Sequence, residues 1–196
     1  EDNQKYKKLR GAYEASQKTA KRMSEKELAM QLARVKNNAE HKPYDLDNFL
    51  KKKPELVKNS IIFCAEWSQA EKVCEVLYKY TKSFKRFKDQ PTKDDQRQAI
   101  NSLGKNLDCI VTCHALSEGI DIKTLKNIFL IASYASQLET IQRIGRCIRV
   151  DPEDDSKVAN VVDLIVYRNI EKEDIIKSDR ERRDWIQLIS EVRPDG

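Results

Sequence analysis

Residues 108–132 read DCIVTCHALSEGIDIKTLKNIFLIA, and this stretch decides the fold class because a polar segment separates two short apolar runs. The first run ends at residue 112 and the second spans 127–132. Similar runs occur at 61–64 and 160–166, and helical patterns separate them along the chain. Apolar strands that alternate with amphipathic helices are typical of a parallel sheet covered on both faces. We therefore predict an α/β fold, with helices on both sides of a parallel sheet.

The expected helices are recognised by apolar residues at spacings of three and four. They are placed at 68–80, 91–103, 137–150 and 170–190. The last of these has five apolar residues available for packing: Ile175, Ile176, Trp185, Ile186 and Ile189. The weak alternation of SFKRFK at 83–88 fits a further strand, which would place four side chains on one face: Lys82, Phe84, Arg86 and Lys88.

The first 58 residues differ from the rest in charge. They hold 15 Lys and Arg against 9 Asp and Glu, a net charge of +6, whereas the remaining residues hold 22 against 23, a net charge of −1. Helical spacing opens the chain, a capping box of Ser24 and Glu27 begins a second helix, and Pro43 is expected to end it. We predict a basic helical extension at 1–58 and an α/β domain at 59–196. The excess charge is typical of a solvated helix surface, and contact with nucleic acid is the alternative.

The cysteines indicate buried thiols. They are Cys64, Cys74, Cys109, Cys113 and Cys147. An odd number without an export signal argues against a disulfide framework. A zinc site needs about four ligands, and no second Cys/His pair lies near Cys109, Cys113 and His114, so we expect no metal site. No apolar run reaches the roughly 18 residues of a membrane span and no signal-peptide pattern opens the sequence, so we expect a cytoplasmic or other intracellular protein without membrane contact.

Two polar segments that contain glycine follow predicted strands. Residues 115–121 read ALSEGID, and residues 142–149 read QRIGRCIR. Ligands of open parallel sheets bind beyond the carboxyl ends of the strands, where both segments begin. Arg146 and Arg149 are three residues apart, so on a helix their guanidinium groups share a face that suits a polyphosphate. The alternative is a surface helix whose arginines pair with nearby carboxylates such as Glu139.

These segments resemble sequence motifs of superfamily 2 helicases and translocases. Residues 142–149 match motif VI, Q/H-R-x-G-R-x-x-R, and residues 115–121 are similar to motif V. The segment SIIFCAEWS at 60–68 is similar to motif IV, and the three motifs occur in the order of that family. The resemblance covers roughly residues 59–166. It implies a RecA-like three-layer domain, the second of two such domains in a motor, preceded here by the helical extension.

The resemblance also implies a nucleotide site. In these motors ATP with Mg²⁺ binds in the cleft between the two RecA-like domains, and the second domain supplies arginine fingers. Arg146 and Arg149 map onto the fingers, which stabilise the charge of the transferred phosphoryl group. Four further residues map onto positions near the nucleotide or the facing domain: Gly119, Asp121, Gln142 and Arg143.

A nucleic-acid surface is implied by the loops of motif IV and the start of motif V. The matching residues are Ala65, Glu66, Trp67, Cys113 and His114. Cys113 stands where motif V usually has Thr, so a hydroxyl contact is not implied there. EGID at 118–121 and Gln142 at the start of motif VI are closer to the DNA-directed branch than to the RNA-directed DEAD-box proteins. We therefore expect DNA rather than RNA as the partner.

The sequence contains neither a G-x-x-x-x-G-K-[ST] loop to hold phosphates nor a D-E-x-H/D box for Mg²⁺. The expected function is that of the second motor domain of an ATP-dependent DNA helicase or translocase. The full-length protein is expected to hydrolyse ATP together with the missing first RecA-like domain, and this chain alone is expected to be inactive. The alternatives are a non-catalytic module that binds nucleic acid or protein, and the motor part of a restriction enzyme.

Overall fold

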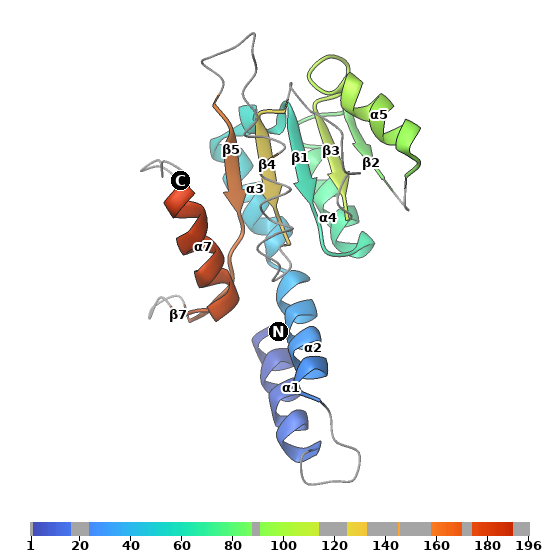
Figure 1. The fold of residues 1–196 in the computed structure, drawn as a ribbon. Coiled ribbons are helices and arrows are strands. Elements are labelled where there is room, and N and C mark those ends of the chain that lie inside the picture. The colour runs from blue at the N-terminus through green and yellow to red at the C-terminus, as the bar shows by residue number, and fades with distance from the viewer. Residues whose placement is uncertain are drawn as a thin grey trace.

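The computed structural model describes residues 2–16, 24–87, 91–113, 125–132, 145, 158–169 and 174–189. Its central feature is a sheet of five parallel strands in the order β2-β3-β1-β4-β5 (Figure 1). The strands are β1 Ser60–Phe63, β2 Phe84–Arg86, β3 Cys109–Thr112, β4 Asn127–Leu130 and β5 Asn160–Asp163. In the middle of the sheet, Ile62 lies opposite Val111 on one side and Phe129 on the other. The predicted parallel sheet is confirmed.

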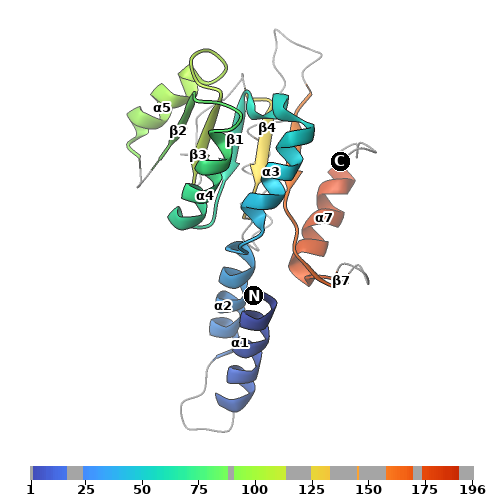
Figure 2. The same cartoon turned by 180° about the vertical axis from the view of Figure 1, so that it is seen from behind.

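Helices cover both faces of this sheet, as predicted. One face carries α3 Lys42–Lys52, the 3-10 turn η1 Pro54–Val57 and α4 Trp67–Leu77, and the other carries α5 Lys93–Ser102 and α7 Lys177–Ile189. Figure 2 shows α3 and α4 in front of the strands. Side chains of β1 alternate between the two cores, with Ile62 on the α3/α4 face and Ile61 and Phe63 on the α5/α7 face. All four residues of β1 are buried, which explains why three of them are apolar, and the hydroxyl of Ser60 donates a hydrogen bond to Val57 O.

Two helices precede the sheet and form a hairpin. They are α1 Asp2–Ser16 and α2 Glu25–Asn37, which pack against each other. The predicted capping box is confirmed: Glu27 N donates to Ser24 Oγ at 3.2 Å, and Ser24 N donates to Glu27 Oε2 at 2.8 Å. The backbone N–H and the hydroxyl of Ser24 both donate to the Glu27 carboxylate, and these two hydrogen bonds lower the pKa of Glu27. The prediction that Pro43 ends α2 is wrong, because α2 ends at Asn37 and Pro43 lies in the first turn of α3, where a missing N–H is tolerated.

The third helix packs differently from the first two. Leu46 and Leu50 of α3 are completely buried and share a core with the sheet. In contrast, every described side chain of the hairpin up to Val35 is at least partly exposed. The packing therefore places α3 with the sheet, and the domain boundary at residue 58 stays a prediction.

The C-terminal part departs from the sequence prediction in two places. β5 ends at Asp163, earlier than predicted. A separate antiparallel pair follows, formed by β6 Tyr167–Asn169 and β7 Asp174–Ile175. The closing helix α7 therefore begins at Lys177 rather than near residue 170. Trp185 and Ile186 of α7 pack against the sheet, as predicted.

A glycine turn connects α5 to β3. Gly104 has a φ of 80°, a left-handed conformation that glycine adopts without strain. A Cβ at this position would come within 2.5 Å of Asn59 Oδ1. The carbonyl of Asn59 accepts hydrogen bonds from Lys126 N at 3.0 Å and Asn127 N at 3.1 Å, which limits the movement of its backbone.

We expect Gly104→Ala to lower the free energy of unfolding by roughly 1–3 kcal/mol, because it adds both backbone strain and a steric clash. Urea denaturation of the variant measures this change. Gly11→Ala is the matched control, since a Cβ there meets nothing within 4 Å and alanine favours the helix. Equal stability of the two variants would contradict the prediction.

Candidate functional site

The loop after β1 contains three of the predicted nucleic-acid residues. Ala65 N donates a hydrogen bond to Gln69 Oε1 at 2.9 Å, which shapes the turn from β1 into α4. Glu66 is the N-cap residue of α4 and is partly exposed. Trp67 is partly buried and packs against both cores of the domain. Packing therefore covers part of the indole ring and reduces the ring surface that is available for stacking on a base.

The end of β3 lies beside this loop. Phe63 of β1 pairs with Thr112 of β3, and Cys64 N donates to Thr112 O at 2.9 Å. Cys113 therefore lies next to the motif IV loop, where it is buried. Burial, reinforced by the negative charge of Glu66, raises the pKa of the Cys113 thiol to about 11. The structure brings Ala65, Glu66, Trp67 and Cys113 together at neighbouring strand ends.

The other predicted site residues lie outside the described residues. They are His114, Gly119, Asp121, Gln142, Arg143, Arg146 and Arg149. The strand ends from which these segments leave are described: β3 and β4 run parallel to β1 and end at the same edge of the sheet. Gly145 of motif VI is described as helical, with open space where a Cβ would stand. β1, β3 and β4 all end at one edge of the sheet, and we name this edge the carboxyl edge.

An ion pair connects the hairpin to the motif IV loop. Arg34 Nε of α2 lies 2.6 Å from Glu66 Oε1. The hydrogen bond and charge of Glu66 raise the pKa of Arg34. A second contact supports the first, because Gln69 Nε2 of α4 donates to Asn37 O at 2.7 Å. Sequence patterns did not predict these contacts, since 32 residues separate the partners in each case.

Four charged residues form a buried ion cluster at the base of the hairpin. They are Lys36, Asp163, Asp179 and Arg182. Lys36 Nζ lies 2.7 Å from Asp179 Oδ1, and both side chains are at most 4% exposed. Arg182 reaches the same Asp179 oxygen at 2.9 Å and holds Asp163 through Nε and Nη2 at 2.8 and 3.1 Å. The cluster joins α2, β5 and α7, which are far apart in the sequence.

The cluster shifts the ionisation of its members. Burial by itself would raise the pKa of Asp179, but the charges of Arg182 and Lys36 outweigh it, so that pKa is lowered. Lys42 lies nearby and donates to the carbonyl of Ile131. Burial lowers the pKa of Lys42 to about 8. The carboxylates of Asp179 and Asp163 oppose this shift, but the positive charges of Arg182 and Lys36, which pair with them, add to it. The sequence prediction gave a packing role to the apolar residues of this charged helix and no role to its charged residues. The spacing of Asp179 and Arg182 on one helix face is the signal that could have indicated the ion cluster.

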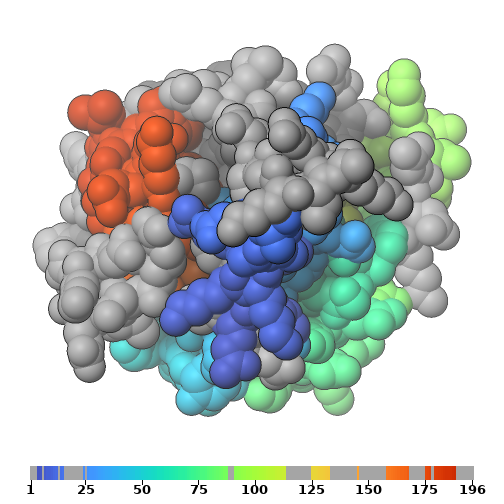
Figure 3. Space-filling model, turned by 90° about the horizontal axis from the view of Figure 1, so that it is seen from below, coloured from blue at the N-terminus to red at the C-terminus, as the bar shows by residue number. Residues whose placement is uncertain are grey.

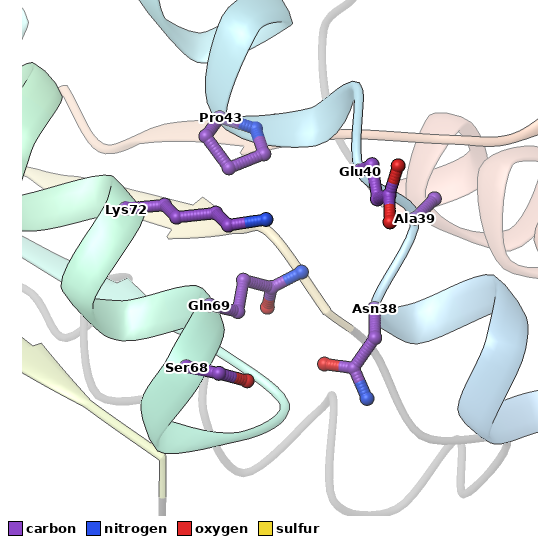
Figure 4. A pocket seen from close by; sticks show the side chains of 7 residues that line it. All are labelled: Asn38, Ala39, Glu40, Pro43, Ser68, Gln69 and Lys72. Carbon is purple, nitrogen blue, oxygen red and sulfur yellow. The ribbon is translucent and has the colours of Figure 1, made fainter.

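A small hollow lies between the α2–α3 connection and α4 (Figure 4). Its volume is about 40 Å³. Its lining residues are Asn38, Ala39, Glu40, Pro43, Ser68, Gln69 and Lys72. Figure 4 shows the side chains of Gln69 and Lys72 reaching toward Asn38 and Glu40 across this space. Ligand pockets are typically several hundred Å³, so the hollow is too small for a nucleotide and suits a water molecule.

The described cysteines are buried free thiols, as predicted. They are Cys64, Cys74, Cys109 and Cys113, and Cys147 lies outside the described residues. Burial raises the pKa of Cys109 to about 12, so this thiol stays protonated and unreactive. Within the described part of the chain, no three residues of the types that bind metals come together. None of the described helices is both long and apolar enough to cross a membrane.

The basic segment around β2 is partly structural. Phe84 packs against the α3/α4 core, while Phe87 belongs to the core on the opposite face. Arg86 Nη1 pairs with Glu71 Oε1 at 3.1 Å, and Lys85 Nζ lies 5.4 Å from the centre of the Phe87 ring. The predicted alternation along this strand is therefore confirmed for the described residues, and Arg86 serves to attach β2 to α4.

Comparisons with known proteins agree with this arrangement. Residues 41–151 match the family described as "Helicase conserved C-terminal domain". The C-terminal part of the Fun30 ATPase domain has a similar fold, with a TM-score of 0.54 and 19% identity over 74% of this chain and 52% of that chain. UvsW of T4 has a TM-score of 0.59 and 17% identity over 95% of this chain and 36% of that chain. S. cerevisiae Dbp5 bound to RNA and ADP BeF3 has a TM-score of 0.51 and 18% identity over 74% of this chain and 36% of that chain.

The chain covers only part of the length of each of these proteins. It spans about half of the Fun30 chain and about a third of the UvsW and Dbp5 chains. No curated protein sequence matches it. The family match covers more than half of the 196 residues and includes all three of the motif segments. The chain therefore belongs to the helicase conserved C-terminal domain family and has a RecA-like α/β fold.

Proposed function

We propose that this chain is the second motor domain of an ATP-dependent DNA helicase or translocase. The observation that carries the proposal is the strand register. β1, β3 and β4 are parallel and adjacent, so the chain leaves all three strands at the carboxyl edge, and the segments that resemble motifs IV, V and VI follow these strands in the sequence. Ligands of open parallel sheets bind at this edge. One surface can therefore serve both the nucleotide and the nucleic acid.

The proposed nucleotide site lies between this domain and a first RecA-like domain outside this chain. That first domain would hold most of the contacts to ATP and Mg²⁺, because the P-loop and the acidic box are not in this sequence. Arg146 and Arg149 would approach the phosphates and stabilise the charge that develops during phosphoryl transfer. Gly119, Asp121 and two residues of motif VI would contact the nucleotide or the facing domain. These two are Gln142 and Arg143.

The proposed nucleic-acid surface uses the loops after β1 and β3. Ala65 and Cys113 are buried, so their contacts to phosphates would come from the backbone, and His114 follows Cys113 directly. At Ala65 such a contact requires its N–H to exchange its hydrogen bond to Gln69 Oε1 for one to the phosphate. Glu66 on its own would repel a phosphate. Arg34 Nε lies 2.6 Å from Glu66 Oε1, so the repulsion is cancelled and a guanidinium group lies beside the neutralised carboxylate. DNA is proposed over RNA because of EGID at 118–121 and Gln142.

ATP hydrolysis by the full-length protein tests this proposal. We expect hydrolysis to be stimulated by single-stranded DNA, and less by RNA of the same sequence. The 196-residue chain by itself is expected to show no turnover. Binding of DNA without any hydrolysis would favour a non-catalytic binding module instead, and stronger stimulation by RNA would correct the choice of partner.

A further inference from the structure

α1 carries four exposed cations within six residues. They are Lys5, Lys7, Lys8 and Arg10, which we name the α1 basic surface. Lys7 and Arg10 lie three residues apart and share a helix face. Among the described residues, Lys7, Lys8 and Arg10 have no acidic partner within ion-pair distance, whereas Lys5 Nζ lies 3.3 Å from Glu40 Oε1. Exposed cations at this density attract a partner that carries repeated negative charge.

The position of this surface is specific. Figures 1 and 2 show the α1–α2 hairpin projecting from the end of the sheet toward which the arrows of β1, β3 and β4 point, which is the carboxyl edge. Figure 3 looks onto this end and shows the dark blue α1 at its centre. The Lys5–Glu40 pair places the start of α1 close to the α2–α3 connection, so Lys5, Lys7 and Lys8 lie in the half of α1 nearer the domain and Arg10 lies just past its middle.

The hairpin is attached to the domain by contacts that fix its direction. Lys36 at the end of α2 is held in the buried ion cluster by Asp179. Arg34 pairs with Glu66 of the motif IV loop, and Asn37 O accepts from Gln69 of α4. Breaking a buried ion pair is costly, so a surface attached in this way keeps its place beside the loop. The α1 basic surface is thus a fixed extension of the carboxyl edge and differs from a freely moving charged tail.

We propose that the α1 basic surface is a second nucleic-acid contact, which binds the phosphate backbone of the strand beyond the motif IV loop. This inference rests on the proposed function, because it requires a strand at the carboxyl edge. Phosphodiester groups supply the repeated negative charge, and lysine and arginine contacts to them are independent of base sequence. The hairpin extends the proposed binding site along the strand, while the loops after β1 and β3 contact the strand near the nucleotide.

The experiment measures binding of a fluorescent single-stranded oligonucleotide to the full-length protein at several salt concentrations. The test variant combines Lys7→Glu, Lys8→Glu and Arg10→Glu. The matched control combines Lys52→Glu, Lys58→Glu and Lys105→Glu, which makes the same change in net charge at exposed positions near the amino ends of the strands. DNA and RNA oligonucleotides of one sequence form separate arms. A version of each variant with Gln in place of Glu distinguishes lost attraction from added repulsion.

We expect the test variant to bind at least about tenfold more weakly near 0.1 M salt, and the slope of log affinity against log salt to fall by roughly two, since each lost phosphate contact removes about 0.7. The control is expected to bind almost as the wild type does, because charges farther away than the roughly 10 Å Debye length are screened. The Gln version of the test variant should lie between wild type and the Glu version.

Two results overturn the inference and are distinguishable. If the wild type and both variants bind with one affinity, the α1 basic surface does not contact nucleic acid and serves another partner, such as an acidic protein surface, while the proposed function stands. If the wild type binds neither DNA nor RNA, the proposed function fails and this inference fails with it. Equal melting temperatures of the wild type and the variants show that any weakened binding is not caused by unfolding.

Discussion

Replacing Arg146 with alanine in the full-length protein is expected to lower nucleic-acid-stimulated ATP hydrolysis by about 10³-fold or more, the range known for arginine fingers in GTPases. A finger acts on charge that develops during phosphoryl transfer, so its loss lowers kcat more than it changes KM. Binding of the nucleic acid is expected to continue, because the predicted contacts to the strand come from other loops. Steady-state ATPase kinetics and oligonucleotide binding measure the two effects.

The matched control for this prediction is Arg183→Ala. Arg183 lies on α7 and pairs with its neighbour Asp184 at 2.9 Å, so its removal takes away an equal charge far from motif VI in the sequence. Arg146→Lys adds a second test, because lysine keeps the charge and loses the planar, fork-shaped set of donors. Turnover of Arg146→Ala at the wild-type rate would rule out the finger and with it the proposed motor role.

Replacing Asp179 with alanine is expected to lower the free energy of unfolding by about 3–5 kcal/mol, the usual cost of removing one partner from a buried ion pair. Asp179 is completely buried and accepts hydrogen bonds from Lys36, Arg182 and the backbone N–H of Val166. Its loss leaves two buried cations and a buried N–H without their partner. Urea denaturation followed by circular dichroism measures the change, and the melting temperature should fall in parallel.

Glu181→Ala is the matched control, two residues further along the same helix. Glu181 is 66% exposed and lies 3.7 Å from Lys177, so its removal is expected to cost less than about 1 kcal/mol. Similar losses of stability in the two variants would contradict the structural role of Asp179. Replacing Lys36 with methionine in each background measures the coupling energy between Lys36 and Asp179 directly.

Sequence reasoning predicted the centre of the sheet well, because β1, β3 and β4 are covered on both faces and are therefore mostly apolar. The runs at 61–64, 108–112 and 127–132 overlap β1, β3 and β4, with boundaries that differ by one or two residues. The capping box of Ser24 and Glu27 was equally predictable, because both partners lie within one helical turn. Local signals of this kind require no knowledge of the tertiary structure.

The incorrect predictions concern elements whose structure depends on contacts with residues far away in the sequence. α7 begins late because β6 and β7 pair first, and such pairing depends on contacts that periodicity does not report. The sequence prediction assigned no role to the charged residues of α7, yet Asp179 and Arg182 are buried because Lys36 and Asp163 compensate them. The carry-over of catalytic and nucleotide roles to Arg146 and Arg149 depends on the motif alone and stays a prediction.

The sequence by itself determined the order of strands and helices and the motif segments that follow the strands, because hydrophobic periodicity and motif spacing are local properties. Only the tertiary structure decided how the first 58 residues relate to the domain. It places α3 in the core and attaches the α1–α2 hairpin to the carboxyl edge through Lys36 and Arg34. The physical reason is that a buried charge is tolerated only beside its counter-charge, and that partner lies more than a hundred residues away in the case of Lys36 and Asp179.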